Sequence, residues 1–136
     1  MDLAEAISFA GENHRSVLAT HRQDGSIQQS PVVHAVDASG RVMISTRAPA
    51  MKVHNIRRDP RVSLCAFSDA FFGSWALLIG TAEIVSRPEA MPLLEETYRQ
   101  VAGEHKDWDE FRKAMDDQQR VIVRITATAG GPTKSG

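Results

Sequence analysis

Cysteine and long apolar runs are nearly absent from the sequence. Cys65 is the only cysteine among 136 residues, so no disulfide can form within the chain. No apolar run approaches the roughly 20 residues that a membrane-spanning helix needs, and the first residues lack the basic start and apolar stretch of a secretory signal. We therefore expect a protein that does not enter membranes and that works in the reducing cytoplasm.

Neither sign of charge dominates the chain, whose formal net charge is -1. A nucleic-acid-binding domain is usually strongly basic, so we expect no nucleic-acid partner. The charges are unevenly placed, however. Residues 83–119 hold ten acids and five bases, whereas residues 47–61 hold five bases and one acid. This local excess of positive charge favours a small anionic ligand.

The sequence also lacks the motifs of common catalytic and metal sites. Its glycines match neither a phosphate-binding P-loop nor a Rossmann fingerprint, and no serine lies in a Gly-x-Ser-x-Gly turn. The five histidines stand singly, without the spacing of metal ligands, and Cys65 has no neighbouring base to activate it. We therefore predict no metal site and assign no catalytic residue. His34 and Tyr98 are the only candidates for a proton donor, and both are better explained as structural.

The length fits one domain, which we predict to span residues 1–128, followed by a mobile tail at residues 129–136. Alternating apolar residues and turn signals predict six strands, at residues 15–20, 27–36, 41–46, 61–67, 73–85 and 121–128. Helical spacing predicts helices at residues 3–11, 49–58, 89–104 and 108–115. The first three strands should form an antiparallel meander, because their turns are too short for parallel crossovers. The pattern indicates a small antiparallel barrel with accessory helices.

Local signals refine this outline. Asp2 should cap the first helix and Ser86 the third, since both residue types accept hydrogen bonds from free N–H groups at a helix start. Gly80 interrupts a long strand and should mark a bulge. Val53 and Ile56 should face the core from the second helix.

The basic segment at residues 44–62 joins a strand to a helix. The strand ends in Ser-Thr-Arg at residues 45–47, and Pro49 suits the first turn of a helix that carries Lys52. Free backbone N–H groups at a helix start, two hydroxyls, an arginine and a lysine are the groups that bind a phosphate ester. The segment therefore predicts a phosphate site at the start of the helix.

Three stretches of the chain carry a family resemblance: "VLATHRQDGSIQQSPV", "MISTRAPAMKVHNIRRDPRVSLCAF" and "WALLIGTAEIV". They resemble the split β-barrel flavin and deazaflavin oxidoreductases, the superfamily of pyridoxamine 5'-phosphate oxidase. The likeness covers about residues 3–126. It is strongest to the branch of coenzyme F420-dependent enzymes, the FDOR-B type.

The resemblance implies a six-stranded antiparallel Greek-key split β-barrel of the FMN-binding type. It also implies a homodimer with two equivalent cofactor sites at the subunit interface, and backbone at residues 18–20 and 30–32 that faces the cofactor ring. Residues near the phosphate come from the strand end and the helix, and Trp75 would lie near the ring or the interface. The candidate cofactor-binding residues are Ser45, Thr46, Arg47, Met51, Lys52, Asn55, Arg57 and Trp75.

The resemblance leaves the cofactor open between F420 and FMN. In the pyridoxamine oxidases a lysine often follows the arginine directly, whereas here Lys52 is five positions after Arg47, which favours the deazaflavin branch. F420 also carries an oligoglutamate tail, for which His54, Arg57 and Arg58 are plausible partners. The two arginines are equally well explained as cations at the C-terminal end of a helix.

The expected function is hydride transfer between the deazaflavin and a small organic substrate, with the cofactor supplying the chemistry. One alternative is an FMN-binding oxidoreductase like pyridoxamine phosphate oxidase. Another is a non-catalytic protein that carries a flavin or binds haem.

Overall fold

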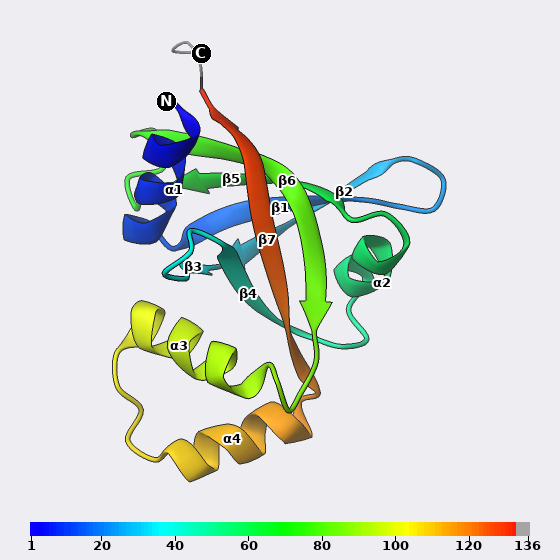
Figure 1. The fold of residues 1–136 in the computed structure, drawn as a ribbon, viewed down its shortest axis with the longest axis vertical. Helices are drawn as coiled ribbons and strands as arrows, with labels where there is room; N and C mark the ends of the chain where they lie inside the picture. Colours follow the sequence, from blue (N-terminus) through cyan, green and yellow to red (C-terminus); the bar gives the residue numbers. More distant parts are fainter. Residues whose placement is uncertain (133–136) are drawn as a thin grey trace.

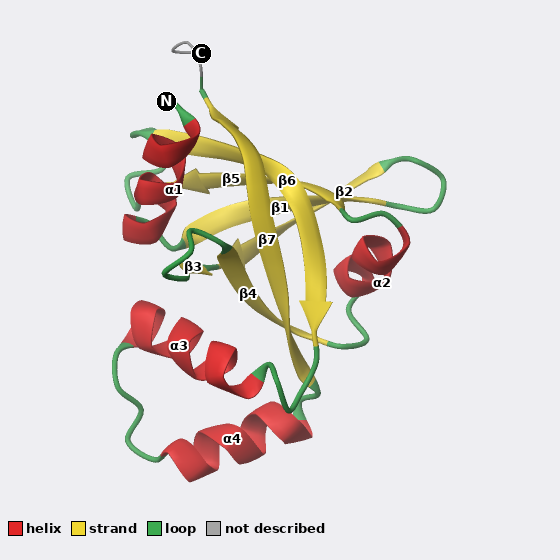
Figure 2. Cartoon of the chain, in the orientation of Figure 1, coloured by secondary structure: helices red, strands yellow, loops and turns green. Residues whose placement is uncertain are grey.

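The computed structural model describes residues 1–132, in which seven antiparallel strands form one curled sheet (Figure 1). The strands are β1 (Arg15–His21), β2 (Ile27–Val33), β3 (Ala35–Val36), β4 (Val42–Arg47), β5 (Arg61–Phe67), β6 (Trp75–Val85) and β7 (Arg120–Gly131). The helices are α1 (Leu3–Glu12), α2 (Met51–Arg58), α3 (Met91–Ala102) and α4 (Trp108–Asp117). The sheet order is β2-β1-β5-β6-β7-β4-β3. This is the mainly β split barrel with accessory helices that the sequence predicts (Figure 2).

The chain crosses from one edge of the sheet to the other at His34. β2 and β3 are the two edge strands, yet only His34 separates them in the sequence, so the crossing closes the curled sheet into a barrel. The sequence predicts one strand over residues 27–36, and the break at His34 turns six predicted strands into seven. The expected three-stranded meander is interrupted at the same point: residues 27–33 pair with β1 and residues 35–36 pair with β4, both antiparallel, but β4 does not lie beside β2 in the sheet.

The first two helices close the barrel and follow the sequence signals closely. The Asp2 carboxylate accepts a hydrogen bond from the Glu5 N–H at 2.8 Å, so Asp2 caps α1 as predicted. α2 begins at Met51, after Pro49 instead of at it. Val53 and Ile56 are buried, as its apolar spacing predicts.

The other two helices form a hairpin below the barrel (Figure 2). α4 lies close to its predicted position, but the start of α3 was predicted too early. Residues 87–90 form turns, and Ala90 takes the N-cap position without a side-chain hydrogen bond, so the predicted cap at Ser86 is wrong.

β4 and the first part of β7 are buried on both faces. Ile44 and Val123 belong to the core inside the barrel, whereas their neighbours Met43 and Ile122 belong to a second apolar cluster under α3 and α4. Consecutive buried residues are expected where a strand is covered on both sides. The α3–α4 hairpin is therefore a second layer over this part of the sheet.

The ladder between β6 and β7 shifts register between Ile79 and Gly80, where the sequence predicts a bulge. A Cβ atom on Gly80 would lie 2.0 Å from the carbonyl oxygen of Thr126, so a side chain there would collide with the backbone. β7 continues through Gly131, so residues 129–131 of the predicted tail pair with β6. The last part of that tail, residues 133–136, lies outside the described residues.

Across residues 1–132, none of the helices combines the length and the apolar character needed to span a membrane.

Candidate functional site

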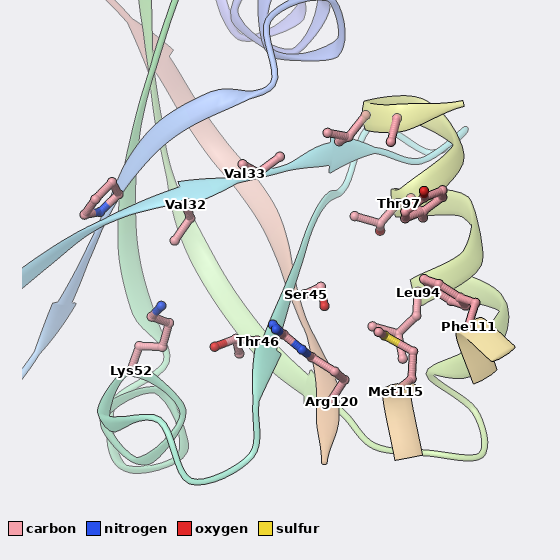
Figure 3. A pocket seen from close by; sticks show the side chains of 14 residues that line it. Val32, Val33, Ser45, Thr46, Lys52, Leu94, Thr97, Phe111, Met115 and Arg120 are labelled. Carbon is pink, nitrogen blue, oxygen red and sulfur yellow. The ribbon is translucent and has the colours of Figure 1, made fainter. Parts of the chain in front are cut away.

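A cavity of about 530 Å³ lies between the barrel and the α3–α4 hairpin (Figure 3). Its volume is in the range of small-molecule and cofactor sites. β2, β4, α2 and β7 supply one side, and α3 and α4 supply the other. The lining residues are Pro31, Val32, Val33, Ser45, Thr46, Lys52, Leu94, Thr97, Tyr98, Val101, Ala102, Phe111, Met115 and Arg120.

One end of the cavity is polar and positively charged. Ser45 and Thr46 reach it from the end of β4, Lys52 from the first turn of α2, and Arg120 from the start of β7. In Figure 3 the Lys52 amine and the Arg120 guanidinium both point into the cavity, with the Thr46 hydroxyl between them. The pairing of β4 with β7 places Arg120 beside the end of β4, because Arg47, the residue after Thr46, lies opposite Arg120 in the ladder.

In the part of the chain that the structure describes, the cations of this end have no acidic partner. Burial lowers the pKa of Lys52, and the nearby Arg120 lowers it further. Burial likewise lowers the pKa of Arg120, with a contribution from Arg47. Within residues 1–132, none of these three side chains forms an ion pair. Partly buried cations without counter-charges favour the binding of an anion.

The start of α2 adds to this preference. Among residues 1–132, no side chain caps the helix, so the positive end of its dipole near Lys52 is not compensated by a cap. The donor set matches a phosphate: two cations, two hydroxyls and a helix start.

The other end of the cavity is apolar and aromatic. α3 contributes Leu94 and Tyr98, and α4 contributes Phe111 and Met115. The Tyr98 ring meets Phe111 edge to face at 5.3 Å between centroids. The exposed edge strand β2 lies across from this wall with residues 31–33. None of the described residues that line the cavity is acidic. The cavity therefore suits a ligand with a flat apolar ring system, which would lie at the aromatic end, and an attached anion, which would lie at the positively charged end.

The structure brings some of the predicted cofactor residues together and separates others. Ser45, Thr46 and Lys52 line the cavity. Arg47 lies directly opposite Arg120 in the β4–β7 ladder, but it does not line the cavity.

Met51, Arg57 and Trp75 also lie outside the lining of the cavity. Met51 is 56% exposed at the start of α2, and Arg57 is exposed on the same helix. Trp75 opens β6, opposite Phe67, whereas the other end of β6 pairs with β7 near the cavity.

Asn55 and Arg58 are engaged in the fold itself. The Asn55 amide donates hydrogen bonds to Thr20 Oγ1 at 3.1 Å and to Gln28 Oε1 at 2.8 Å. Arg58 donates to the carbonyl of His21 at 2.8 Å and to Asn55 Oδ1 at 3.0 Å. Together they tie α2 to the β1–β2 hairpin.

The two candidate proton donors differ in position. His34 is fully buried, and its two ring nitrogens contact Ser16 Oγ at 2.7 Å and the Ala10 carbonyl at 2.9 Å, so it does not face the cavity. Tyr98 lines the cavity.

Sequence reasoning missed Arg120 and, apart from Tyr98, the helical wall. Arg120 precedes an apolar strand, and nothing local distinguishes it from other surface arginines. Its pairing with Arg47 joins residues far apart in the chain, so only the strand order reveals it.

Comparison with known proteins identifies the class. The family model described as pyridoxamine 5'-phosphate oxidase matches residues 3–134. The fold and this match define a protein of the split-barrel flavin and deazaflavin oxidoreductase superfamily. The chain belongs to the pyridoxamine 5'-phosphate oxidase family.

Solved structures share the fold along nearly the whole chain. A conserved hypothetical protein from Mycobacterium tuberculosis is 28% identical, with a TM-score of 0.78, and the match covers 100% of this chain and 92% of that one. An F420 reductase is 22% identical, with a TM-score of 0.72 and coverage of 91% and 94%. A candidate pyridoxamine 5'-phosphate oxidase from Lactobacillus delbrueckii is 18% identical, with a TM-score of 0.66 and coverage of 94% and 91%.

Proposed function

We propose that the protein is a coenzyme F420-dependent oxidoreductase that transfers a hydride between the deazaflavin and a small organic substrate. The observation that carries the proposal is the cavity with Lys52 and Arg120, both without an acidic partner among residues 1–132, at one end and an apolar wall at the other. Membership of a family that binds flavins or deazaflavins supports it.

The residues present fit such a cofactor. Lys52 and Arg120 would bind the phosphate by charge-assisted hydrogen bonds, and Ser45 and Thr46 would add hydroxyl donors. The apolar wall around Tyr98 would orient the ring and exclude water from it. When bound and reduced, the deazaflavin supplies the hydride.

F420 is preferred over FMN because the basic residues exceed what one phosphate needs. Arg47 lies beside Arg120 on the neighbouring strand, and Arg57 and His54 are exposed on α2. These side chains are available to the carboxylates of the oligoglutamate tail, which FMN lacks. Arg58 is a poorer candidate, because it already binds the His21 carbonyl and Asn55. The F420 reductase with the same fold is in keeping with this choice.

Parallel titrations with F420 and FMN test the proposal. We expect F420 to bind more tightly, and removal of glutamates from its tail to weaken binding, because each lost carboxylate removes an attraction to a basic surface. Micromolar binding of FMN without binding of F420 would instead support an FMN oxidoreductase.

A turnover assay then separates an enzyme from a carrier. It measures the oxidation of reduced F420 by a panel of enones and quinones. Tight binding of F420 without turnover would favour the carrier.

We also propose that two chains form a homodimer that completes the cofactor site. Large apolar side chains are exposed on β2, on β6 and in the loop between β5 and β6: Ile27, Val33, Ile79, Phe71 and Phe72. Exposed apolar groups of this kind mark interaction surfaces. Sedimentation is expected to give twice the chain mass of 14.9 kDa, and a monomer at micromolar concentration would contradict the dimer.

A further inference from the structure

The corner between α4 and β7 has an unusual backbone. Gln119 has a φ of 55°, in the left-handed region that residues other than glycine rarely adopt. Such a conformation costs free energy and persists only where surrounding contacts hold it, often at a functional site. The corner leads directly into Arg120, the first residue of β7.

Hydrogen bonds from two sides hold this corner. The Gln119 carbonyl accepts from the Ala48 N–H at 2.8 Å, which ties it to the loop that leads into α2. The Arg120 carbonyl accepts from Arg87 Nε at 2.9 Å. Arg87 also donates to Asp116 Oδ1 at 2.8 Å, so the end of α4 is fixed as well. The backbone of Arg120 is thereby held on both sides.

The Arg120 side chain is also held. Its Nε donates to Gln118 Oε1 at 2.9 Å, and within residues 1–132 its terminal nitrogens have no hydrogen-bond partner. Arg120 shares its face of β7 with Ile122, which packs under the α3–α4 hairpin, so the side chain is directed into the cavity. Figure 3 shows its guanidinium pointing toward Thr46 and Lys52.

This placement is unfavourable without a ligand. Arg47 and Arg120 are direct cross-strand partners, and like charges opposite each other destabilise a sheet. Lys52 adds a third positive charge nearby, and burial together with the charge of Arg120 lowers the pKa of its amine. A strained corner that brings a cation to two others is explained if an anion binds between Lys52 and Arg120.

We propose that Arg120 is a cofactor-binding residue that contacts the anionic group opposite Lys52, and that Gln118 is the positioning residue that holds its guanidinium there. The nature of the anion rests on the proposed function, but the roles of the two residues do not require F420. Gln118 leaves only the terminal N–H groups of Arg120 free, which suits two oxygens of one phosphate.

A double-mutant cycle on cofactor affinity tests the pair. Arg120→Gln should weaken binding by about 10- to 100-fold, as expected for a lost charge-assisted contact. Gln118→Leu should weaken it by roughly 2- to 10-fold, because the free arginine must be ordered on binding. The double variant should bind no more weakly than Arg120→Gln alone, since Gln118 acts only through Arg120. Additive losses would overturn the positioning role.

Two further measurements separate this role from a general effect on folding. Arg120→Gln should flatten the dependence of affinity on salt, whereas Gln118→Leu should keep the wild-type slope. The matched control is Gln23→Leu, on an exposed turn between β1 and β2, which should bind like the wild type. An unchanged salt slope in Arg120→Gln would remove Arg120 from the site.

A thermal-shift measurement with inorganic pyrophosphate tests the role of Arg120 without a cofactor. It should raise the melting temperature of the wild type and fail to do so for Arg120→Gln. If the wild type binds neither F420 nor FMN, the proposed function fails, and the pyrophosphate shift still decides the role of Arg120. Equal shifts in both proteins, or no shift in either, would overturn the inference.

Discussion

The double variant Lys52→Ala, Arg120→Gln is expected to bind the cofactor about 100- to 1,000-fold more weakly than the wild type. Each side chain is a partly buried cation that faces the cavity, and neither forms an ion pair within residues 1–132. A hydrogen bond to a charged group contributes about 1.5 to 3 kcal/mol. The combined loss should be smaller than the sum, because removing one cation relieves the repulsion felt by the other.

The same repulsion predicts the opposite effect on stability without ligand. The double variant should melt at the same temperature as the ligand-free wild type or higher, since two desolvated like charges are removed. Titration by cofactor absorbance or fluorescence and a melting curve without ligand measure the two effects. A loss of both affinity and stability would indicate disruption of the fold instead of a lost contact.

The control for net charge is a second double variant, Lys106→Ala with Arg22→Gln. Both side chains are exposed and lie outside the cavity lining. This variant should bind the cofactor within about twofold of the wild type in moderate salt, where distant charges are screened. An equal loss in the control would mean that the overall field of the protein attracts the cofactor, without a specific role for the cavity cations.

Local signals in the sequence predict most of the elements of the fold. Strand alternation and tight turns locate β1, β5 and β6, and capping by Asp2 locates α1, because these features depend on neighbours in the chain. The break at His34 is invisible at this level. The residues before and after His34 both have the sequence pattern of a strand. Only the closure of the barrel requires the chain to pass there from one edge of the sheet to the other.

The candidate site likewise has one part that local sequence predicts and another part that only the fold brings together. Residues 45–52 are adjacent in the sequence, so their chemistry predicts an anion site without knowledge of the fold. Arg120 reaches that site through the pairing of β4 with β7. Tyr98 and Phe111 reach it because the α3–α4 hairpin folds under the sheet. Their apolar spacing predicts helices with a buried face, but not that the face borders a cavity.

His34 is expected to make the protein sensitive to acid. It is fully buried at the crossing between β2 and β3, and its contacts with Ser16 and the Ala10 carbonyl connect β1 and α1. A carbonyl can only accept, so Nε2 carries the hydrogen and Nδ1 accepts from the Ser16 hydroxyl. Burial lowers the pKa of His34 from 6.5 to about 4, with the nearby His14 contributing.

The lowered pKa of His34 determines the pH range in which the protein loses stability. The unfolded chain binds the proton more readily than the folded one, so stability is complete above pH 6.5 and falls as the pH drops toward 4. The full difference corresponds to about 3 kcal/mol. Asp24 and Asp59 affect a lower range, because hydrogen bonds from Ser26 and Arg61 hold the pKa of each carboxyl below its usual value.

Urea unfolding at several pH values between 7 and 4 measures the effect. The wild type should lose about 3 kcal/mol across this range, and His34→Gln, whose amide can donate to the Ala10 carbonyl and accept from Ser16, should lose much less. His54→Gln, at an exposed position on α2, is the matched control and should keep the wild-type slope. If His34→Gln has that slope too, another group is responsible. If it does not, protonation of His34, at the crossing that closes the barrel, accounts for the loss of stability in acid.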